Sequence, residues 1–285
     1  GTINMIIKKI HFEIDKTNKA KSFKKSIFQK YANYPVRDSD VIVVIGGDGF
    51  MLQILKKYQK YKKPFYGMNR GTFGFLMNKF KLQDIYKKIF RAKPVSISPL
   101  EMKATTKENK TVSAYAINEV SLLRQSKQTS SLQILAKKRI LIKKLIADGV
   151  LVSTPAGSTA YNLSIHGPIL SLNSKKIAVT PISPFRPRRW KGKVLPSSSI
   201  IKIVNLETKK RPVSVVADNI EVRNVKSVKI KINNLIKFKL LYDRDSILTK
   251  KIKLEQIRKE TIWLILVPHT DSNREPTDYK STTKV

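Results

Sequence analysis

The stretch "VIVVIGGDGFML", residues 41–52, decides the fold class of this sequence. Five β-branched aliphatic residues in succession predict a strand that is buried on both faces. Three glycines and one acid follow, Gly46-Gly47-Asp48-Gly49, and a helical apolar pattern begins directly after them. A buried strand that enters a glycine turn and then a helix is typical of an α/β domain with a parallel sheet.

The segments on either side repeat this alternation of strand and helix. Strand-like runs occupy 6–12 and 64–68, and helical apolar spacings occupy 16–32 and 82–92. Strands that alternate with helices predict βαβ units with right-handed crossovers. We therefore expect an α/β domain over residues 1–99.

Past residue 99 the pattern changes to short strand-like runs, many of them separated by turn residues. This pattern predicts a β-rich second domain over residues 100–242, with one helix that begins near Thr159. A helical pattern at 243–260 is expected to pack back on the first domain. The polar tail at 261–285 is expected to be disordered.

Composition narrows the class of protein. Apolar residues make up 41% of the 285 residues, which is sufficient for packed cores, and the lack of cysteine excludes disulfides and thiolate metal sites. The three histidines are widely separated, and no metal-binding set is predicted. The longest apolar run, "TIWLILVP" at 261–268, is much shorter than the ~20 residues that span a bilayer. Because the N-terminus also lacks a signal-peptide pattern, we expect a cytoplasmic protein with no membrane association.

The formal net charge of +37 raises the question of a polyanionic partner. Lysine greatly outnumbers arginine and is scattered through predicted helices and strands alike. No arginine-rich arm, zinc finger or aromatic RNA-binding signature is present. We therefore expect a lysine-rich surface that attracts anionic substrates, with no specific nucleic-acid partner. A basic nucleic-acid-binding protein is the alternative.

Asp48 is unusual in a turn whose glycines suit the approach of backbone N–H groups to phosphate. The turn lacks the Gly-Lys-Ser/Thr of a Walker A loop and is not the six-residue dinucleotide fingerprint. Two tasks fit an acid at such a site: general base toward a hydroxyl that attacks a phosphate, or a ligand that helps to hold Mg²⁺ between phosphates. The structural alternative is a cap on the following helix.

Two further segments carry polar groups in apolar surroundings. Asn118 and Glu119 interrupt an apolar strand-like run, and adjacent side chains in a strand point to opposite faces. An amide and a carboxylate suit base edges and ribose hydroxyls; the alternative is a polar strand end. A second run enters a turn of small and hydroxylated residues at 154–161, where Tyr161 could stack on a base.

Taken in their order along the chain, these motifs closely resemble those of the NAD kinase family. The glycine turn alone is shared with diacylglycerol kinase-like and phosphofructokinase-like enzymes, so a lipid or sugar kinase is a further alternative. The resemblance covers roughly residues 6–260 and rests on Gly46-Gly47-Asp48-Gly49, "NRGTFGFL" (69–76), Asn118-Glu119, Asp148-Gly149 with "STPAGSTAYNLS", and "ADN" (217–219).

The resemblance implies a Rossmann-like α/β domain followed by a β-sandwich-like domain, with the active site between them. ATP, or polyphosphate in some members, donates a phosphoryl group to the 2′-hydroxyl of the adenosine ribose of NAD and gives NADP. Mg²⁺ accompanies ATP. Members form homodimers or homotetramers, and part of the NAD site can come from a neighbouring subunit.

The resemblance also assigns roles to individual residues. Asp48 is the catalytic proton acceptor, and Gly49 with the rest of the turn faces the phosphates. Asn118 and Glu119 are expected to hold the adenosine and its ribose, and Asp148 to contact the nicotinamide end. The other residues expected to line the NAD pocket are Ala156, Thr159, Ala160, Tyr161 against the adenine, Asn162, Leu163, Ser164 and Asn219.

Two positions depart from the family pattern. Ala156 stands where many members have Thr or Ser, which removes a side-chain hydroxyl, and His166 replaces a common Gly. Neither change removes Asp48 or the Asn118-Glu119 pair.

Overall fold

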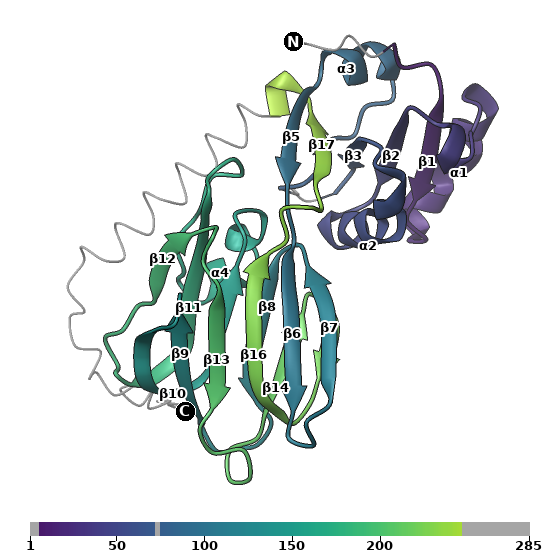
Figure 1. The fold of residues 1–285 in the computed structure, drawn as a ribbon. Coiled ribbons are helices and arrows are strands. Elements are labelled where there is room, and N and C mark those ends of the chain that lie inside the picture. Colours follow the sequence, from purple (N-terminus) through teal and green to yellow (C-terminus); the bar gives the residue numbers. More distant parts are fainter. Residues whose placement is uncertain (1–5, 72–74, 247–285) are drawn as a thin grey trace, which may run out of the picture.

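The computed structural model describes residues 6–71 and 75–246 and has two parts, an α/β domain and a strand-rich domain (Figure 1). Residues 72–74 of the "NRGTFGFL" segment lie outside the described residues. Beyond Ser246, so do the predicted helix at 243–260 and the tail at 261–285.

The α/β domain is built on a six-stranded sheet with the strand order β1-β2-β3-β17-β5, and β4 pairs with β3. Its strands are β1 (Ile10–Ile14), β2 (Val41–Ile45), β3 (Phe65–Asn69), β4 (Asn78–Lys79), β5 (Lys93–Ile97) and β17 (Phe238–Tyr242). Its helices are α1 (Asn18–Lys30), α2 (Asp48–Tyr58) and α3 (Ile85–Arg91), with short 3-10 turns η1 (Val36–Asp38) and η2 (Gln59–Tyr61).

Strand β2 is buried on both faces, as its continuous apolar sequence predicts. Ile42 and Val44 pack in one cluster with Met51 and Leu55 of α2. The side chains that alternate with them lie in a second cluster with residues of α1 and α3; these are Val41, Val43 and Ile45. Helices on both faces therefore hold the sheet, and the glycine turn leaves β2 at its carboxyl end.

The sheet is parallel, as expected, in all of its strand pairs but one, which makes it a mixed sheet. Strand β17 runs parallel to β3, whereas β5 runs antiparallel to β17. Both strands lie at the junction with the second domain: β5 leads into it and β17 returns from it. The range predicted for the β-rich domain, 100–242, thus ends with a strand that completes the first sheet.

The second domain is one antiparallel sheet of eleven strands, in the order β15-β14-β8-β10-β9-β13-β16-β6-β7, with β11 between β10 and β12. Strand β14 also lies against β7 and β16, so the sheet curls on itself into a near-barrel instead of the expected β-sandwich. The short helices η3 (Ala156–Thr159) and α4 (Tyr161–Ser164) follow β10. The strands are β6 (Leu100–Thr106), β7 (Thr111–Ala116), β8 (Glu119–Arg124), β9 (Ser130–Ala136), β10 (Arg139–Ser153), β11 (Lys176–Arg186), β12 (Lys193–Pro196), β13 (Ile201–Asn205), β14 (Val213–Ala217), β15 (Ile220–Val222) and β16 (Val225–Ile232).

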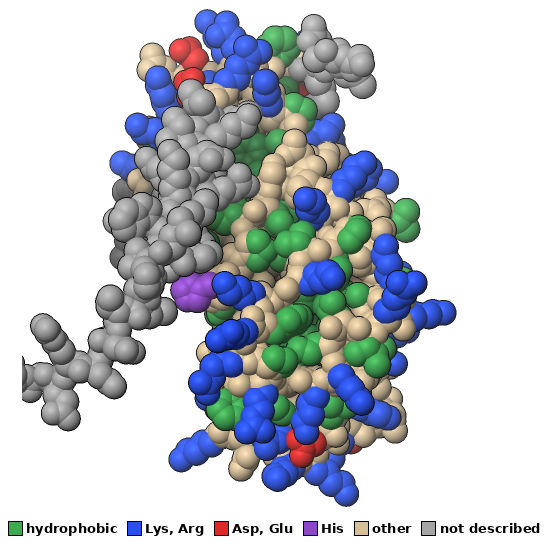
Figure 2. Space-filling model, turned by 90° about the vertical axis from the view of Figure 1, so that its left-hand side faces the viewer, with side chains coloured by type: hydrophobic (Ala, Val, Ile, Leu, Met, Phe, Trp, Pro, Cys, Tyr) green, Lys and Arg blue, Asp and Glu red, His purple; other side chains and the backbone are tan. Residues whose placement is uncertain are grey.

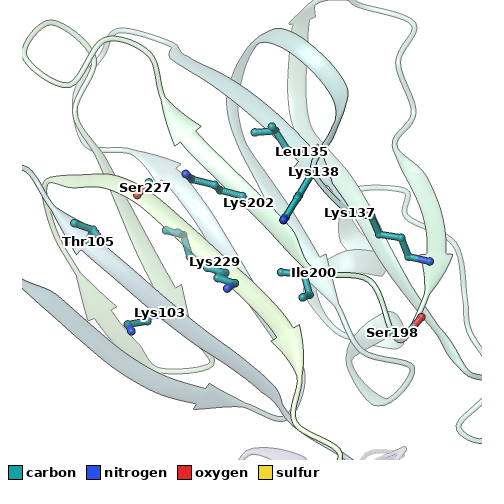
Figure 3. A pocket seen from close by; sticks show the side chains of 11 residues that line it. Lys103, Thr105, Leu135, Lys137, Lys138, Ser198, Ile200, Lys202, Ser227 and Lys229 are labelled. Atoms are coloured by element: carbon teal, nitrogen blue, oxygen red, sulfur yellow. The ribbon is translucent and has the colours of Figure 1, made fainter.

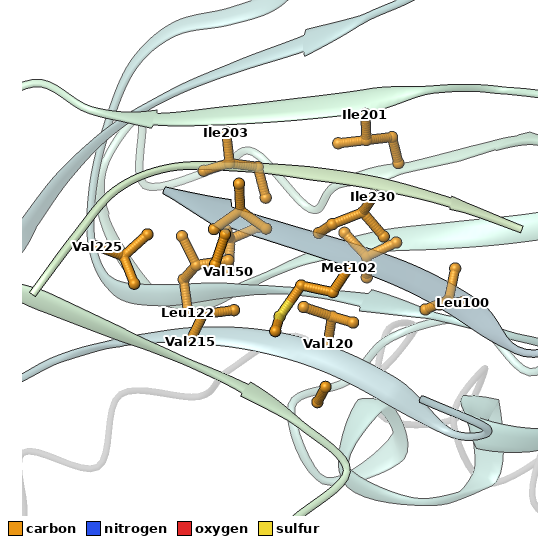
Figure 4. Close-up of a cluster of buried hydrophobic side chains, with 14 of the residues drawn as sticks. Leu100, Met102, Val120, Leu122, Val150, Ile201, Ile203, Val215, Val225 and Ile230 are labelled. Carbon is orange, nitrogen blue, oxygen red and sulfur yellow. The ribbon is translucent and has the colours of Figure 1, made fainter. Parts of the chain in front are cut away.

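The interior of the curled sheet is filled by aliphatic side chains from strands far apart in the sheet order (Figure 4). Met102 of β6, Leu122 of β8 and Ile203 of β13 belong to this one cluster and are almost fully buried. Burial of a side chain of this size contributes about 1.5–3 kcal/mol. Alternation of buried and exposed residues along β6 and β16 places the polar side chains on the outer surface.

The two domains share an apolar cluster. Ile117, just before β8, and Ala156 of η3 pack with Met51 and Leu55 of α2. This contact brings the start of β8 and the end of β10 beside the helix that follows the glycine turn.

Lysine and arginine side chains are spread over the face shown in Figure 2 and greatly outnumber the acidic ones there. None of the helices that the structure describes is long and apolar enough to cross a membrane.

Candidate active site

The glycine turn presents bare backbone at the carboxyl end of β2. A Cβ on Gly46 would lie 2.7 Å from Cδ1 of Phe50 and 3.1 Å from Cβ of Asp15, so this position is too crowded for a side chain. In contrast, apart from the adjoining backbone, no atom of the described residues lies within 4 Å of the place that a Cβ would take at Gly47 or Gly49. Open space beside two glycines, at the N-terminus of a helix, suits the approach of a phosphate group.

Asp48 is the first residue of α2, and its carboxylate is oriented by another segment of the chain. The N-cap position belongs to Gly47, which argues against the helix-cap role for Asp48. One oxygen of Asp48 accepts a hydrogen bond of 2.9 Å from the N–H of Phe75, and the other accepts one of 3.1 Å from the N–H of Leu76. These donors fix the direction of the carboxylate and partly offset its charge.

Tyr242 holds the segment of Phe75 and Leu76 in place through a hydrogen bond. Its buried hydroxyl donates to the carbonyl of Phe75 at 3.2 Å. Burial, and then the nearby charge of Asp48, raise the pKa of Tyr242, so the phenol keeps its proton and remains a donor. Strand β17 thereby contributes to the position of Asp48.

Asn118 and Glu119 lie at the start of β8, in a backbone segment held from two sides. The carboxylate of Asp218 accepts hydrogen bonds from the N–H groups of Ile117 at 2.7 Å, Asn118 at 3.0 Å and Glu119 at 3.3 Å. On the other side, the N–H of Thr154 donates to the carbonyl of Asn118 at 3.0 Å, and its hydroxyl donates to that of Ile117 at 2.6 Å.

The side chains of this pair carry polar atoms that are buried without a partner. Within the described part of the chain, neither Oδ1 of Asn118 nor Oε2 of Glu119 has a hydrogen-bond partner. Such atoms are rare in folded proteins, and each lost hydrogen bond costs about 1–3 kcal/mol. Burial, and then the charge of Asp218, raise the pKa of Glu119 to about 7. Unpaired buried acceptors and a perturbed carboxyl are typical of a site that a ligand completes.

A cavity of about 650 Å³ joins the two domains at this point. Gly49, Gln53 and Lys56 of α2 line one side, and the Asn118-Glu119 pair lines the other together with the Asp218-Asn219 turn. Nζ of Lys56 lies 3.3 Å from Oδ2 of Asp218 and links the domains across the cavity. The volume is within the range of pockets for small molecules and cofactors.

The "STPAGSTAYNLS" segment begins where β10 ends and is packed tightly on the Asn118 backbone. A Cβ on Gly157 would lie 2.0 Å from the carbonyl oxygen of Asn118, so only glycine permits this approach. Gly157 also donates its N–H to the hydroxyl of Thr154 at 3.1 Å. The start of the turn is thereby held against the backbone of Asn118, whereas none of the residues 159–164 lines the cavity of about 650 Å³.

Among the predicted pocket residues, Ala156 and Asn162 face the protein interior. Ala156 belongs to the apolar cluster shared by the domains. Nδ2 of Asn162 donates to the carbonyls of Ser158 and Pro168, and its Oδ1 accepts from the hydroxyl of Thr180 at 2.7 Å. The fully buried amide of Asn162 therefore holds the turn closed.

Asp148 lies apart from the cavity within this chain. It precedes Ser153 by five positions on β10, and Ser153 is the residue that pairs with Glu119. At ~3.3 Å per residue the separation along the strand is roughly 16 Å. Asp148 is partly exposed and forms an ion pair of 2.8 Å with Arg124.

His166 lies just past α4 at φ 65°, in the left-handed region that favours glycine. This conformation gives a physical reason for the glycine that the family pattern has at this position. The side chain is exposed. Over residues 6–71 and 75–246, no group of three or more His, Cys, Asp or Glu side chains is placed to hold a metal ion.

Sequence reasoning missed three residues that shape the site: Lys56, Thr154 and Asp218. The signal for Asp218 was present, since Asp218-Asn219 forms the two-residue turn between β14 and β15, and Asp218 has a φ of 52°. Asp and Asn are the residues that tolerate such a conformation. No sequence signal distinguishes Lys56 from the other lysines of the chain.

An oriented acid beside Gly49, which lines one side of a cavity, and a buried amide and carboxylate on the other side form the arrangement of a nucleotide-dependent phosphotransferase. Comparisons with known proteins give the family. The family model of the ATP-NAD kinase N-terminal domain matches residues 5–92, and that of the ATP-NAD kinase C-terminal domain matches residues 117–235. The chain belongs to the NAD kinase family, which confirms the resemblance found in the sequence.

Relatives of known name agree with this assignment. The chain is 45% identical to an NAD kinase of Brucella suis over 249 residues, which are 87% of this chain and 97% of that one. It is 44% identical to an NAD kinase of Zymomonas mobilis over 244 residues, 85% and 95% of the two chains.

Two solved structures share the fold at 21% identity. Yeast NADH kinase complexed with NADH has a TM-score of 0.69, and the matched region covers 96% of this chain and 91% of the yeast chain. An NAD kinase from Archaeoglobus fulgidus in complex with ATP has a TM-score of 0.66 and covers 87% and 98%. The two-domain architecture predicted from the sequence is therefore confirmed, with a mixed first sheet and a near-barrel second domain.

Proposed function

We propose that this protein phosphorylates NAD at the 2′-hydroxyl of the adenosine ribose, with ATP as donor and Asp48 as proton acceptor. The observation that carries the proposal is a pair of buried acceptors, Oδ1 of Asn118 and Oε2 of Glu119, for which the described residues supply no hydrogen-bond partner. They line the same cavity as Gly49 of the glycine turn. A ribose and an adenine supply hydroxyl and amino donors for these two atoms.

The proposed step forms two bonds, from the 2′-oxygen to phosphorus and from the proton to Asp48, and breaks two. The 2′-oxygen of the ribose attacks the terminal phosphorus of ATP, its O–H proton passes to the carboxylate of Asp48, and the bond from that phosphorus to the bridging oxygen breaks to release ADP. The N–H groups of Phe75 and Leu76 hold the carboxylate in one orientation for the transfer. A positioned base contributes ~10²–10⁴ in rate.

For the nucleoside, we propose that Asn118 and Glu119 bind the adenosine and its ribose, and that Tyr161 packs against the adenine. Thr159, Ala160, Leu163 and Ser164 would line the pocket around that ring. Three further residues complete the set: Ala156 and Asn162 shape the turn from its buried side, and Asn219 is a polar contact at the cavity rim.

Mg²⁺ is proposed to enter with ATP and to neutralise charge on the phosphates. Magnesium sites of this kind use one or two carboxylates together with substrate phosphates and waters, instead of a complete protein cage. The carboxylates beside the glycine turn, Asp48 and Asp15, fit this pattern. No larger set of acidic or histidine ligands is present in the described residues.

Asp148 is proposed to contact the nicotinamide end of NAD bound in a neighbouring subunit of a homodimer or homotetramer. Its roughly 16 Å offset along β10 from the residue that pairs with Glu119 supports a role outside its own cavity. We propose the cytoplasm as the location, because both substrates are available there.

The direct test is NADP formation by the purified protein with NAD and Mg-ATP, measured in parallel with polyphosphate as donor. We expect NADP with ATP; the polyphosphate reaction determines the breadth of donor use. A panel of lipids and sugars as acceptors separates this function from kinases that share the glycine turn. Absence of NADP, with phosphorylation of another acceptor in the panel, would contradict the proposal.

A further inference from the structure

A second cavity lies on the outer surface of the near-barrel, in the other domain from the glycine turn. Its volume is about 930 Å³, and strands β6, β9, β13 and β16 form its floor. Figure 3 shows lysine side chains placed around it from several strands. We call this cavity the lysine groove; its five lysines are Lys103, Lys137, Lys138, Lys202 and Lys229.

Three of these lysines stand directly opposite one another across adjacent strands. Lys202 of β13 pairs with Lys229 of β16, and Lys229 pairs with Lys103 of β6. Neighbouring strands are ~4.8 Å apart, and like charges in directly opposed positions destabilise a sheet. The bare sheet therefore carries a repulsion that a bound anion would relieve.

The next pairs along the sheet differ in character. On one side, Ser227 pairs with Thr105, and both hydroxyl residues line the groove. On the other side, Lys231 pairs with Glu101, so that the sheet places an acid opposite a lysine there. No acid lines the groove, and none of its five lysines forms an ion pair within the described residues.

The β9–β10 hairpin adds two more positive charges at the edge of the groove. Its two-residue turn consists of Lys137 and Lys138, with φ of 50° and 64°. A turn with both central residues in the left-handed region strongly prefers Asn-Gly or Asp-Gly. Two lysines in this conformation cost conformational energy, and binding of an anion by their charged side chains would offset that cost.

The residues that line the lysine groove suit some classes of anion better than others. Single-stranded nucleic acid is bound on aromatic platforms that stack the bases, and none of the described residues that line the groove is aromatic. A row of ammonium groups beside two hydroxyls instead suits an anion that carries a charge on every repeating unit and no base. We propose that the lysine groove binds inorganic oligophosphate of three or more phosphoryl groups, at a site separate from the catalytic cavity.

The test compares two variants that lose the same charge. The groove variant is Lys103→Gln, Lys202→Gln and Lys229→Gln together. The matched control is Lys24→Gln, Lys25→Gln and Lys30→Gln, three exposed positions of α1 in the other domain. Tripolyphosphate is titrated calorimetrically into each variant and the wild type at several salt concentrations.

We expect the groove variant to lose at least ten-fold in affinity for tripolyphosphate, and the control to keep the wild-type affinity. Because fewer charged contacts make binding less dependent on salt, the slope of log affinity against log salt should be shallower in the groove variant than in the control. Lys229→Gln alone, at the centre of the row, should give an intermediate slope. NAD phosphorylation should be unchanged in all of them.

Two results would overturn the inference. The first is equal affinity and equal salt dependence in the groove variant and the control, which would assign the binding to overall charge or to the catalytic cavity. The second is loss of binding to a single-stranded oligonucleotide in the groove variant while tripolyphosphate binding persists. If the wild type formed no NADP, that result would contradict the proposed reaction but would leave the conclusion from the tripolyphosphate titration unchanged.

Discussion

At the scale of single residues, the carboxylate of Asp48 is the group on which the proposed chemistry depends. Asp48→Asn keeps the shape of the side chain but removes the proton acceptor. We expect turnover to fall by ~10²–10⁴ while the apparent affinity for NAD changes little. Steady-state NADP formation measures both.

Asp38→Asn is the matched control, since Asp38 is an exposed acid in η1 of the same domain. It should retain wild-type turnover. Near-normal turnover in Asp48→Asn would assign to Asp48 a role in organising phosphates instead of accepting the proton.

Glu119 makes the stability of the unliganded protein depend on pH. Its pKa is raised from 4.5 to about 7, first by burial and then by Asp218. Between these values the folded state keeps a proton that the unfolded state has released. The free energy of unfolding therefore falls as pH rises through this window, by at most about 3 kcal/mol, and is then constant with respect to this group.

Urea unfolding of the wild type and Glu119→Gln at pH 5 and pH 7.5 tests this contribution. The fall in stability should be smaller in Glu119→Gln, which cannot titrate. Glu108→Gln, at an exposed position in the β6–β7 turn, should behave like the wild type. An unchanged pH dependence in Glu119→Gln would show that this carboxyl titrates normally.

At the scale of elements, Lys56 connects α2 to the β14–β15 turn through its ion pair with Asp218. Lys56→Gln leaves the largely buried carboxylate of Asp218 without its cation, although three backbone donors remain. We expect a loss of about 1–2 kcal/mol in the free energy of unfolding. Denaturant titration measures it, and the exposed Lys60→Gln should lose no more than about 0.5 kcal/mol.

The fit of η3 against the start of β8 depends on Gly157. A methyl group there would meet the backbone oxygen of Asn118, which cannot move aside as a flexible side chain would. Gly157→Ala should therefore lower the free energy of unfolding by about 1–3 kcal/mol or more and reduce NAD binding. Gly71→Ala, where Oδ1 of Asn69 is the nearest atom of the described residues at 3.5 Å, is the control. Equal stability of the two variants would contradict the contact.

Local patterns predicted the elements that they encode directly. The run at 41–45 is β2 at the expected bounds, whereas the first strand, expected at 6–12, is β1 at Ile10–Ile14. The mixed order of the first sheet could not be predicted, because β17 joins it from a segment nearly 170 residues away from β3. The local periodicity of a sequence does not show which distant strands pair with each other.

Only part of the candidate site could be proposed from the sequence. Asp48, Asn118 and Glu119 stood out because polar groups interrupt apolar or glycine-rich runs. Lys56 did not, since a lysine in a basic helix looks ordinary until the second domain is placed against it. Thr154 did not, since a threonine in a hydroxyl-rich turn looks ordinary until the start of β8 is placed beside it.

At the scale of the whole molecule, the shared cluster of Ile117, Ala156, Met51 and Leu55 couples the two domains. We therefore expect a single cooperative unfolding transition, followed in urea by far-UV circular dichroism and by loss of NADP formation, with coincident midpoints. Activity lost well before the secondary structure would contradict this coupling. Saturating ATP and NAD should move both midpoints upward together, because they bind only the folded state.

The path of the chain through β17 also sets an order of events during synthesis. The ribosome delivers β1, β2, β3 and β5 first, yet β17 is the strand that lies between β3 and β5. The first sheet thus keeps a gap at its centre until residues 238–242 have left the exit tunnel, by which time every strand of the near-barrel is available to fold. For this protein the usual order, in which the N-terminal domain is finished first, is reversed. The last of the described strands to be made is the one that closes the first domain and brings Tyr242 close to Asp48.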